Sequence, residues 1–98
     1  MSHRLKGVKT SGSVFHSLGF PPADVENLRV RAVMMNALIS HIERRKLTQA
    51  QAAKLLGTTQ PRVSDLMRGK IDLFSIDTLV NLLAAFGLRV DLRVRKAA

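Results

Sequence analysis

The sequence predicts a mainly α-helical domain of four to five helices that ends in one β-strand. Apolar residues recur every three or four positions through most of the chain, which is the spacing of amphipathic helices. Threonine, serine and proline stand where these helices would begin, and glycine stands where they would end. Only the last segment alternates apolar and charged residues, as a half-buried strand does. A length of 98 residues suits a single core.

Residues 1–13 are predicted to form a flexible basic arm, and residues 14–98 the single domain. The arm carries three basic residues and no acidic one, which is typical of a mobile tail. The next segment is apolar and contains two of the four phenylalanines. We expect it to dock on the chain's own core or on a partner, through Val14, Phe15, Leu18 and Phe20.

A long helix is predicted after Pro21 and Pro22, because proline ends a preceding element and suits the first turn of a helix. Asp24 and Glu26 add the negative charge that a helix N-terminus favours. The apolar residues that follow step by three and four and predict a core-facing stripe. That stripe comprises Leu28, Ala32, Met34, Met35, Leu38, Ile39 and Ile42.

The next stretch predicts a short helix with both ends marked. Thr48 and Gln51 have the spacing of a capping box, in which each side chain satisfies a free backbone amide of the first turn. Gly57 can adopt the left-handed conformation that commonly follows the last residue of a helix.

Another helix is predicted directly afterwards. Thr59 is its expected cap, Pro61 lies in its first turn, where the missing amide hydrogen costs nothing, and Gly69 ends it. Its inward face is expected to consist of Val63, Leu66 and Met67.

The last helix is predicted between Ser75, its cap, and Gly87, its end. Its expected core residues are Ile76, Leu79, Val80, Leu83 and Ala84.

Residues 88–95 predict the strand, because Leu88, Val90, Leu92 and Val94 alternate with charged residues. A strand needs a partner for its backbone, so we expect it to pair with the same strand of a second copy across a two-fold axis. An axis at Asp91 would stack like charges, so the axis is expected at Val90 or Leu92. Two alternatives are pairing with residues 13–16 and addition to a partner protein's sheet.

The charge of the chain points to a polyanionic partner. Sixteen Lys and Arg against seven Asp and Glu give a net charge of +9, which favours nucleic acid first and an anionic membrane second. The absence of cysteine excludes disulfides, zinc fingers and thiolate nucleophiles. No signal or membrane-spanning segment is evident, so a cytoplasmic location is expected.

No catalytic pattern is found, so we expect neither enzyme activity nor a cofactor or metal site. The histidines His3, His16 and His41 share no ligand spacing. No Ser-His-Asp order, carboxylate pair or phosphate-binding glycine loop is present.

Two short helices joined at a glycine form a helix-turn-helix pattern over residues 47–70. Ala53 lets the second helix approach, Gly57 accepts the turn, and Val63 fills the angle between the helices. This stretch resembles the helix-turn-helix of the lambda repressor-like (XRE) family without a gap. The shared residues are Leu47, Gln49, Ala50, Ala53, Gly57, Thr58, Thr59, Gln60, Leu66, Gly69 and Lys70.

Residues 12–95 together resemble HigA-type antitoxins of the XRE family. The resemblance rests on the Gly-Ser-Val-Phe-x-x-Leu-Gly opening, on residues 47–50, 60–64 and 74–75, and on the final alternation. It implies an antitoxin that represses its own promoter and binds a RelE/HigB-like toxin, here through Val14–Phe20. A general repressor without a toxin, and an adaptor that binds only protein, are the alternatives.

The geometry of a helix in the major groove and the resemblance to the XRE family predict the same DNA-contacting residues. The first turn of the second helix would enter the major groove, where Gln suits adenine and Arg suits guanine. The expected base-reading residues are Thr59, Gln60, Arg62 and Asp65. The family usually has Gln or Asn in place of Asp65, so its carboxylate is expected to pair with Arg62 or Arg68 rather than accept from cytosine. The expected phosphate contacts are Gln49, Thr58, Arg68 and Lys70.

Overall fold

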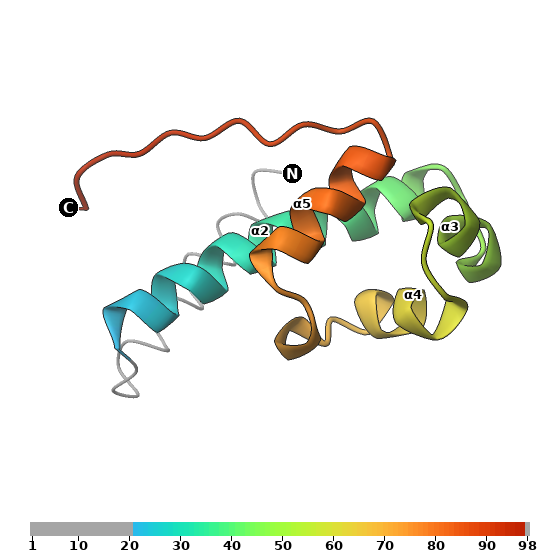
Figure 1. Cartoon of the computed structure of the whole chain (residues 1–98), viewed down its shortest axis with the longest axis horizontal. Coiled ribbons are helices and arrows are strands. Elements are labelled where there is room, and N and C mark those ends of the chain that lie inside the picture. The colour runs from blue at the N-terminus through green and yellow to red at the C-terminus, as the bar shows by residue number, and fades with distance from the viewer. Residues whose placement is uncertain (1–20, 98) are drawn as a thin grey trace.

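A computed structural model describes residues 21–97 as a bundle of four α-helices and one short 3-10 helix (Figure 1). The predicted basic arm and the apolar segment Val14–Phe20 lie outside the described residues.

Helix α2 (Pro22–Arg44) is the long helix that the prolines predicted. Its buried residues are Met34, Met35, Leu38 and Ile42, whereas Leu28, Ala32 and Ile39 of the predicted stripe are only half-buried. Residues near the start of α2 are less buried because its first turns extend beyond the helices that pack on its later half (Figure 1).

Helices α3 (Gln49–Leu56) and α4 (Gln60–Met67) form the predicted pair of short helices. The capping box of α3 is confirmed. The Gln51 amide donates to Thr48 Oγ1 at 3.1 Å, and the Thr48 amide donates to Gln51 Oε1 at 2.8 Å. Thr59 caps α4 by accepting from the Arg62 amide at 3.3 Å.

A 3-10 helix, η1 (Ile71–Leu73), follows α4 and was not predicted. Phe74 comes next, buried in the core, and Ser75 then caps α5 (Ile76–Ala85) by accepting from the Thr78 amide at 3.1 Å. Both the cap and the glycine that follows this helix agree with the sequence analysis.

The predicted core face of α5 is partly wrong. Leu79 and Leu83 are buried as expected, but Val80 and Ala84 are exposed and Leu82 is buried instead. Helix α5 packs on both α2 and α3, and the side of α5 that is buried in these contacts includes Leu82. The helical period alone could not distinguish between faces that carry so many apolar residues.

The predicted strand at residues 88–95 is not formed in the single chain. Residues 88–97 form a segment without regular secondary structure, called the C-terminal arm below, which runs back along the molecule toward the start of α2 (Figure 1). Backbone groups of an isolated extended segment have no ladder partner, so no sheet can form. Leu88 and Val90 pack against the core, whereas Leu92 and Val94 are exposed.

The core lies where α2, α4 and α5 meet and continues into α3. Its largest fully buried side chains are Phe74, Leu38, Leu66, Leu79 and Val63. No buried side-chain nitrogen or oxygen of the described residues lacks a hydrogen-bond partner. Among the same residues, no helix is long and apolar enough to cross a membrane.

Candidate nucleic-acid interface

Helices α3 and α4 are held at a fixed angle by one small residue and one left-handed glycine. Ala53 is buried, and its carbonyl accepts from the Thr58 amide at 3.0 Å. Gly57 has φ 69°, a conformation that L side chains adopt at a cost. Val63 and Leu66 of α4 are buried below this turn. The arrangement packs one face of α4 on the body of the domain and leaves the start of the helix exposed.

The first turn of α4 faces solvent, as a helix that enters a DNA groove requires. Thr59, Gln60 and Pro61 are all exposed. Because the buried residues Val63 and Leu66 lie on one side of the helix, Pro61 and Asp65 lie on the opposite side. Of the four predicted base-reading residues, Thr59 and Gln60 are therefore exposed to solvent, whereas Arg62 and Asp65 are half-buried.

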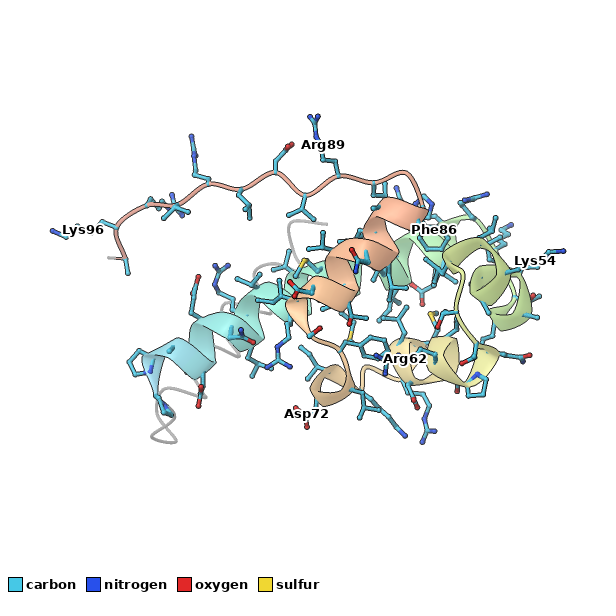
Figure 2. The ribbon with its side chains drawn as sticks, in the orientation of Figure 1. Lys54, Arg62, Asp72, Phe86, Arg89 and Lys96 are labelled. Atoms are coloured by element: carbon cyan, nitrogen blue, oxygen red, sulfur yellow. The ribbon has the colours of Figure 1, made fainter. Side chains whose placement is uncertain are left out.

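Arg62 is half-buried, and its guanidinium carbon lies 4.1 Å from the centre of the Phe74 ring. Figure 2 shows Arg62 on the side of α4 that faces the segment leading into α5. Stacking on a ring holds the plane of a guanidinium while leaving its N–H edges free to donate. The Arg62 side chain makes no ion pair or hydrogen bond to another described residue.

Asp65 pairs with a cation, but the partner differs from the two expected ones. Its Oδ1 lies 3.5 Å from Lys70 Nζ, and no ion pair with Arg62 or Arg68 is present among the described residues. The backbone explains the choice, because the Lys70 amide donates to the Asp65 carbonyl at 3.1 Å. The chain turns back at Gly69, whose φ is 71°, and this turn brings Lys70 next to Asp65.

The four residues expected to bind phosphate lie at the ends of the two helices. Gln49 is the first residue of α3, and Thr58 lies in the turn between the helices; both are half-buried. Arg68 and Lys70 follow the last residue of α4, and both are exposed. Basic and polar side chains and helix N-termini commonly contact the DNA backbone.

Arg31 of α2, which no sequence pattern singled out, supports the turn after α4. Its guanidinium donates to the Ile71 carbonyl at 3.0 Å and to Asn27 Oδ1 at 2.6 Å. The first bond spans 40 residues, so no local spacing could have revealed it. It connects the long helix to the segment that carries Lys70.

His41 lies near the end of α2, with its ring centre 4.6 Å from that of Phe86. Burial lowers its pKa below the ordinary value, and the positive charges of Arg45 and Arg44 lower it further. The described residues contain no group of three or more side chains suited to holding a metal ion.

Comparison with known proteins identifies the family. A family of helix-turn-helix domains matches residues 14–95. A solved structure assigned as an XRE-family transcriptional regulator is 38% identical to this chain, with a TM-score of 0.69; the match covers 76% of this chain and 83% of that one. No curated protein matches the chain. Both matches agree with the two-helix arrangement of α3 and α4: this chain belongs to the XRE-type helix-turn-helix family of DNA-binding transcriptional regulators.

Proposed function

We propose that the chain binds a specific operator sequence by placing the first turn of α4 in the major groove. The observation that carries this proposal is the exposure of Thr59, Gln60 and Pro61 at the start of a helix whose other face is buried. The groove of B-DNA admits one α-helix, and bases are read there by side chains of the leading turn. The net charge of +9 supplies the attraction to phosphate.

Gln60 and Arg62 are assigned to the bases, with Thr59 beside them. Gln60 would pair with an adenine, and the Arg62 fork, steadied by Phe74, would reach a guanine. Asp65 is assigned to holding Lys70 in place of a direct contact with cytosine, because its Oδ1 lies 3.5 Å from Lys70 Nζ. Gln49, Thr58, Arg68 and Lys70 are assigned to phosphates.

Selection of binding sites from random duplexes, followed by titration at fixed salt, tests these assignments. We expect Gln60→Ala and Arg62→Ala each to reduce the preference for the selected site about tenfold or more, while binding to unrelated duplex persists. Asn81→Ala and Arg29→Ala, which change exposed residues on α5 and α2, serve as matched controls. Equal binding of wild type to selected and unrelated duplexes would contradict the proposal and favour the protein-binding adaptor.

The operator-bound form is proposed to be a homodimer joined through the C-terminal arms, at Leu88, Val90, Asp91, Leu92 and Val94. Two reading helices related by a two-fold axis suit an inverted-repeat operator. Sedimentation of the chain with and without DNA tests the dimer.

We further propose that the regulator is the antitoxin of a toxin–antitoxin pair and represses its own promoter. The support is the resemblance of residues 12–95 to HigA-type antitoxins, and the proposed toxin contact is Val14–Phe20. Co-expression with the adjacent reading frame, followed by pull-down, tests this assignment. The expected result is a stable complex with a RelE/HigB-like toxin that is lost when Phe15 and Phe20 are changed to serine. No complex with the neighbouring product would favour a general repressor.

A further inference from the structure

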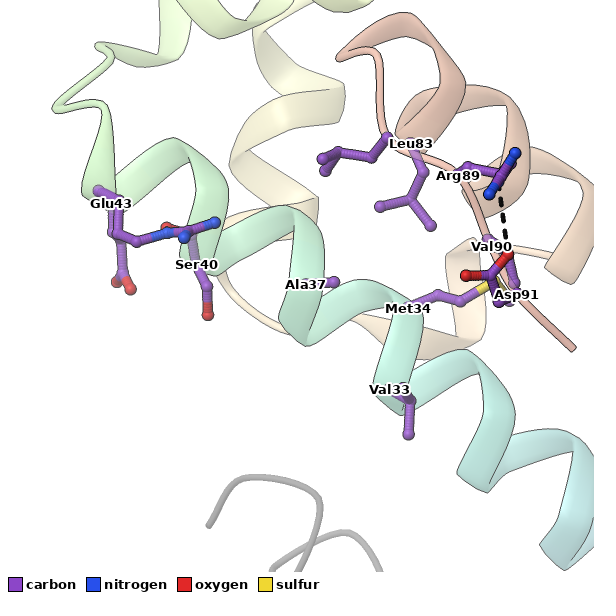
Figure 3. A pocket seen from close by; sticks show the side chains of 11 residues that line it. Val33, Met34, Ala37, Ser40, Glu43, Leu83, Arg89, Val90 and Asp91 are labelled. Atoms are coloured by element: carbon purple, nitrogen blue, oxygen red, sulfur yellow. Dashed lines mark hydrogen bonds and ion pairs between the residues drawn. The ribbon is translucent and has the colours of Figure 1, made fainter. Parts of the chain in front are cut away.

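An apolar groove runs between α2 and the C-terminal arm (Figure 3). Its volume is about 610 Å³. Apolar side chains line both walls: Val33, Met34 and Ala37 come from α2, and Leu83, Leu88 and Val90 from the other side. Burial of such a surface by an apolar side chain is favourable.

The C-terminal arm carries the same apolar face beyond the groove. In an extended chain, alternate residues point to the same side, and Leu88 and Val90 use this side to pack on the core. Leu92 and Val94 continue it, but their exposed fractions are 82% and 96%. From Arg89 to Ala97, the backbone makes no hydrogen bond to another described residue. The arm therefore presents both an open ladder edge and an unburied apolar face.

We propose that the arm pairs antiparallel with the arm of a second copy on a two-fold axis at Val90, and that Leu92 of each copy covers the groove of the other. This inference rests on the proposed homodimer and deepens it by assigning the register.

Charge selects this register over those with the axis at Leu92 or at Asp91. With the axis at Val90, Arg89 of each copy lies opposite Asp91 of the other, and no like charges face each other. An axis at Leu92 also pairs Asp91 with Arg93, but it places Arg89 opposite Arg95. An axis at Asp91 places the two carboxylates opposite each other. In the single chain, Arg89 Nε already lies 3.4 Å from Asp91 Oδ1 (Figure 3), so both side chains project from the same face of the arm.

The same register places apolar side chains over the groove. Residues directly opposite in an antiparallel pair lie on the same face of the sheet, so Leu92 of the second copy would lie beside Leu88. Leu88 borders the groove, and the second copy would thus supply the missing apolar cover. The groove and the exposed leucine complement each other only when two copies combine.

Single-cysteine variants of the full chain test the register, since the natural sequence has no cysteine. Residues paired across the axis have Cα atoms about 4.5–5.5 Å apart, which is within the range of a disulfide. Under mild oxidation without DNA, we expect Val90→Cys to form a covalent dimer at least about tenfold faster than Asp91→Cys or Leu92→Cys. Asn81→Cys, on the exposed face of α5, reports random collision.

Faster cross-linking of Asp91→Cys or Leu92→Cys would overturn the register at Val90. If all four variants cross-link at the same slow rate and wild type sediments as a monomer, the pairing itself is overturned. Titration of the same preparation with operator duplex then shows separately whether the proposed DNA binding holds.

Charge reversal provides a second readout. Asp91→Arg would place Arg opposite Arg and weaken dimerisation about tenfold. The double variant Arg89→Asp with Asp91→Arg restores the opposite-charge pairs and the net charge, so it should dimerise like wild type. Asp72→Arg, which makes the same charge change at an exposed residue of η1, should have little effect. A double variant as weak as Asp91→Arg would contradict the predicted pairs.

Discussion

Arg62 contributes to the packing of the fold and is also proposed to contact a base. Its guanidinium lies on the ring of Phe74, and its backbone amide completes the cap of α4. A side chain stacked in this way loses less conformational freedom on binding than a freely rotating arginine.

Replacement of Phe74 tests the coupling between the ring and Arg62. Phe74→Leu keeps most of the apolar volume but removes the ring face, so part of its cost to stability is the lost cation–π contact of about 0.5–2 kcal/mol. We expect the loss of stability caused by Arg62→Ala to be about 0.5–2 kcal/mol smaller in the Phe74→Leu chain than in wild type. Urea unfolding of the four chains in a double-mutant cycle measures the difference. Equal effects of Arg62→Ala in both backgrounds would mean that the stack contributes nothing.

Gly57 is required for its conformation and not for its size. A Cβ at this position would meet no atom within 4 Å, yet φ is 69°. Gly57→Ala should therefore cost about 1–2 kcal/mol of stability from backbone strain alone. Gly57→Asn should cost less, because asparagine tolerates the left-handed region better. Thermal unfolding of both variants checks this order, and equal melting temperatures for Ala and wild type would contradict it.

His41 makes stability depend on pH in a defined direction. Its lowered pKa in the folded chain means that the unfolded chain takes up a proton more readily. Stability is therefore fully present above the unfolded pKa of about 6.5 and declines as pH falls from there toward the lowered folded pKa.

The measurement compares urea midpoints at about pH 5.5 and pH 7.5 for wild type and His41→Gln. The decline on acidification should be smaller in the variant. His3 and His16 are present in both chains and cancel. An unchanged decline would assign the effect to other groups.

At the scale of the element, the helix ends were the most predictable part of the fold. Thr48, Thr59 and Ser75 cap their helices as expected because a cap acts across three residues of the same chain. The face of α5 and the state of residues 88–95 depend on which surface lies opposite. Neither could be read locally, since Val80 and Leu82 are equally apolar and a strand exists only when paired.

The candidate site likewise has features that the sequence predicts and features that depend on tertiary contacts. Its exposed members, such as Gln60 and Lys70, follow from position along the helices. The contacts that steady them, Arg62 on Phe74 and Arg31 on the Ile71 carbonyl, join residues distant in sequence. Tertiary packing creates such contacts, and the spacing of residues in the sequence does not predict them.

The capping box of α3 offers an element-scale prediction. Thr48→Ala removes the acceptor of the Gln51 amide and should destabilise the chain by about 1 kcal/mol. Thr48→Ser keeps the hydroxyl and should be close to wild type. Chemical unfolding measures both. A serine variant as unstable as the alanine variant would show that the methyl group, and not the hydrogen bond, matters.

At the scale of the whole molecule, positive charge should dominate the strength of DNA binding. Each phosphate contact contributes about 0.9 to the slope of log affinity against log salt. Lys70→Gln should lower that slope by about 1 and weaken binding to all duplexes alike. Arg29→Gln makes the same change of charge at an exposed residue of α2 that is assigned no phosphate contact, and it should leave the slope unchanged. Titrations at several salt concentrations distinguish the two, and equal slopes for both variants would remove Lys70 from the interface.

The proline in the leading turn of α4 limits how this regulator can meet DNA. Pro61 has no amide hydrogen and a restricted φ, so the peptide backbone there has nothing to donate to an operator and little room to adjust to one. Discrimination must then come from the neighbouring side chains, on a tip that is already stiff before contact. Such a tip should tolerate few altered operator sequences, because a mismatch cannot be accommodated by local rearrangement of the main chain.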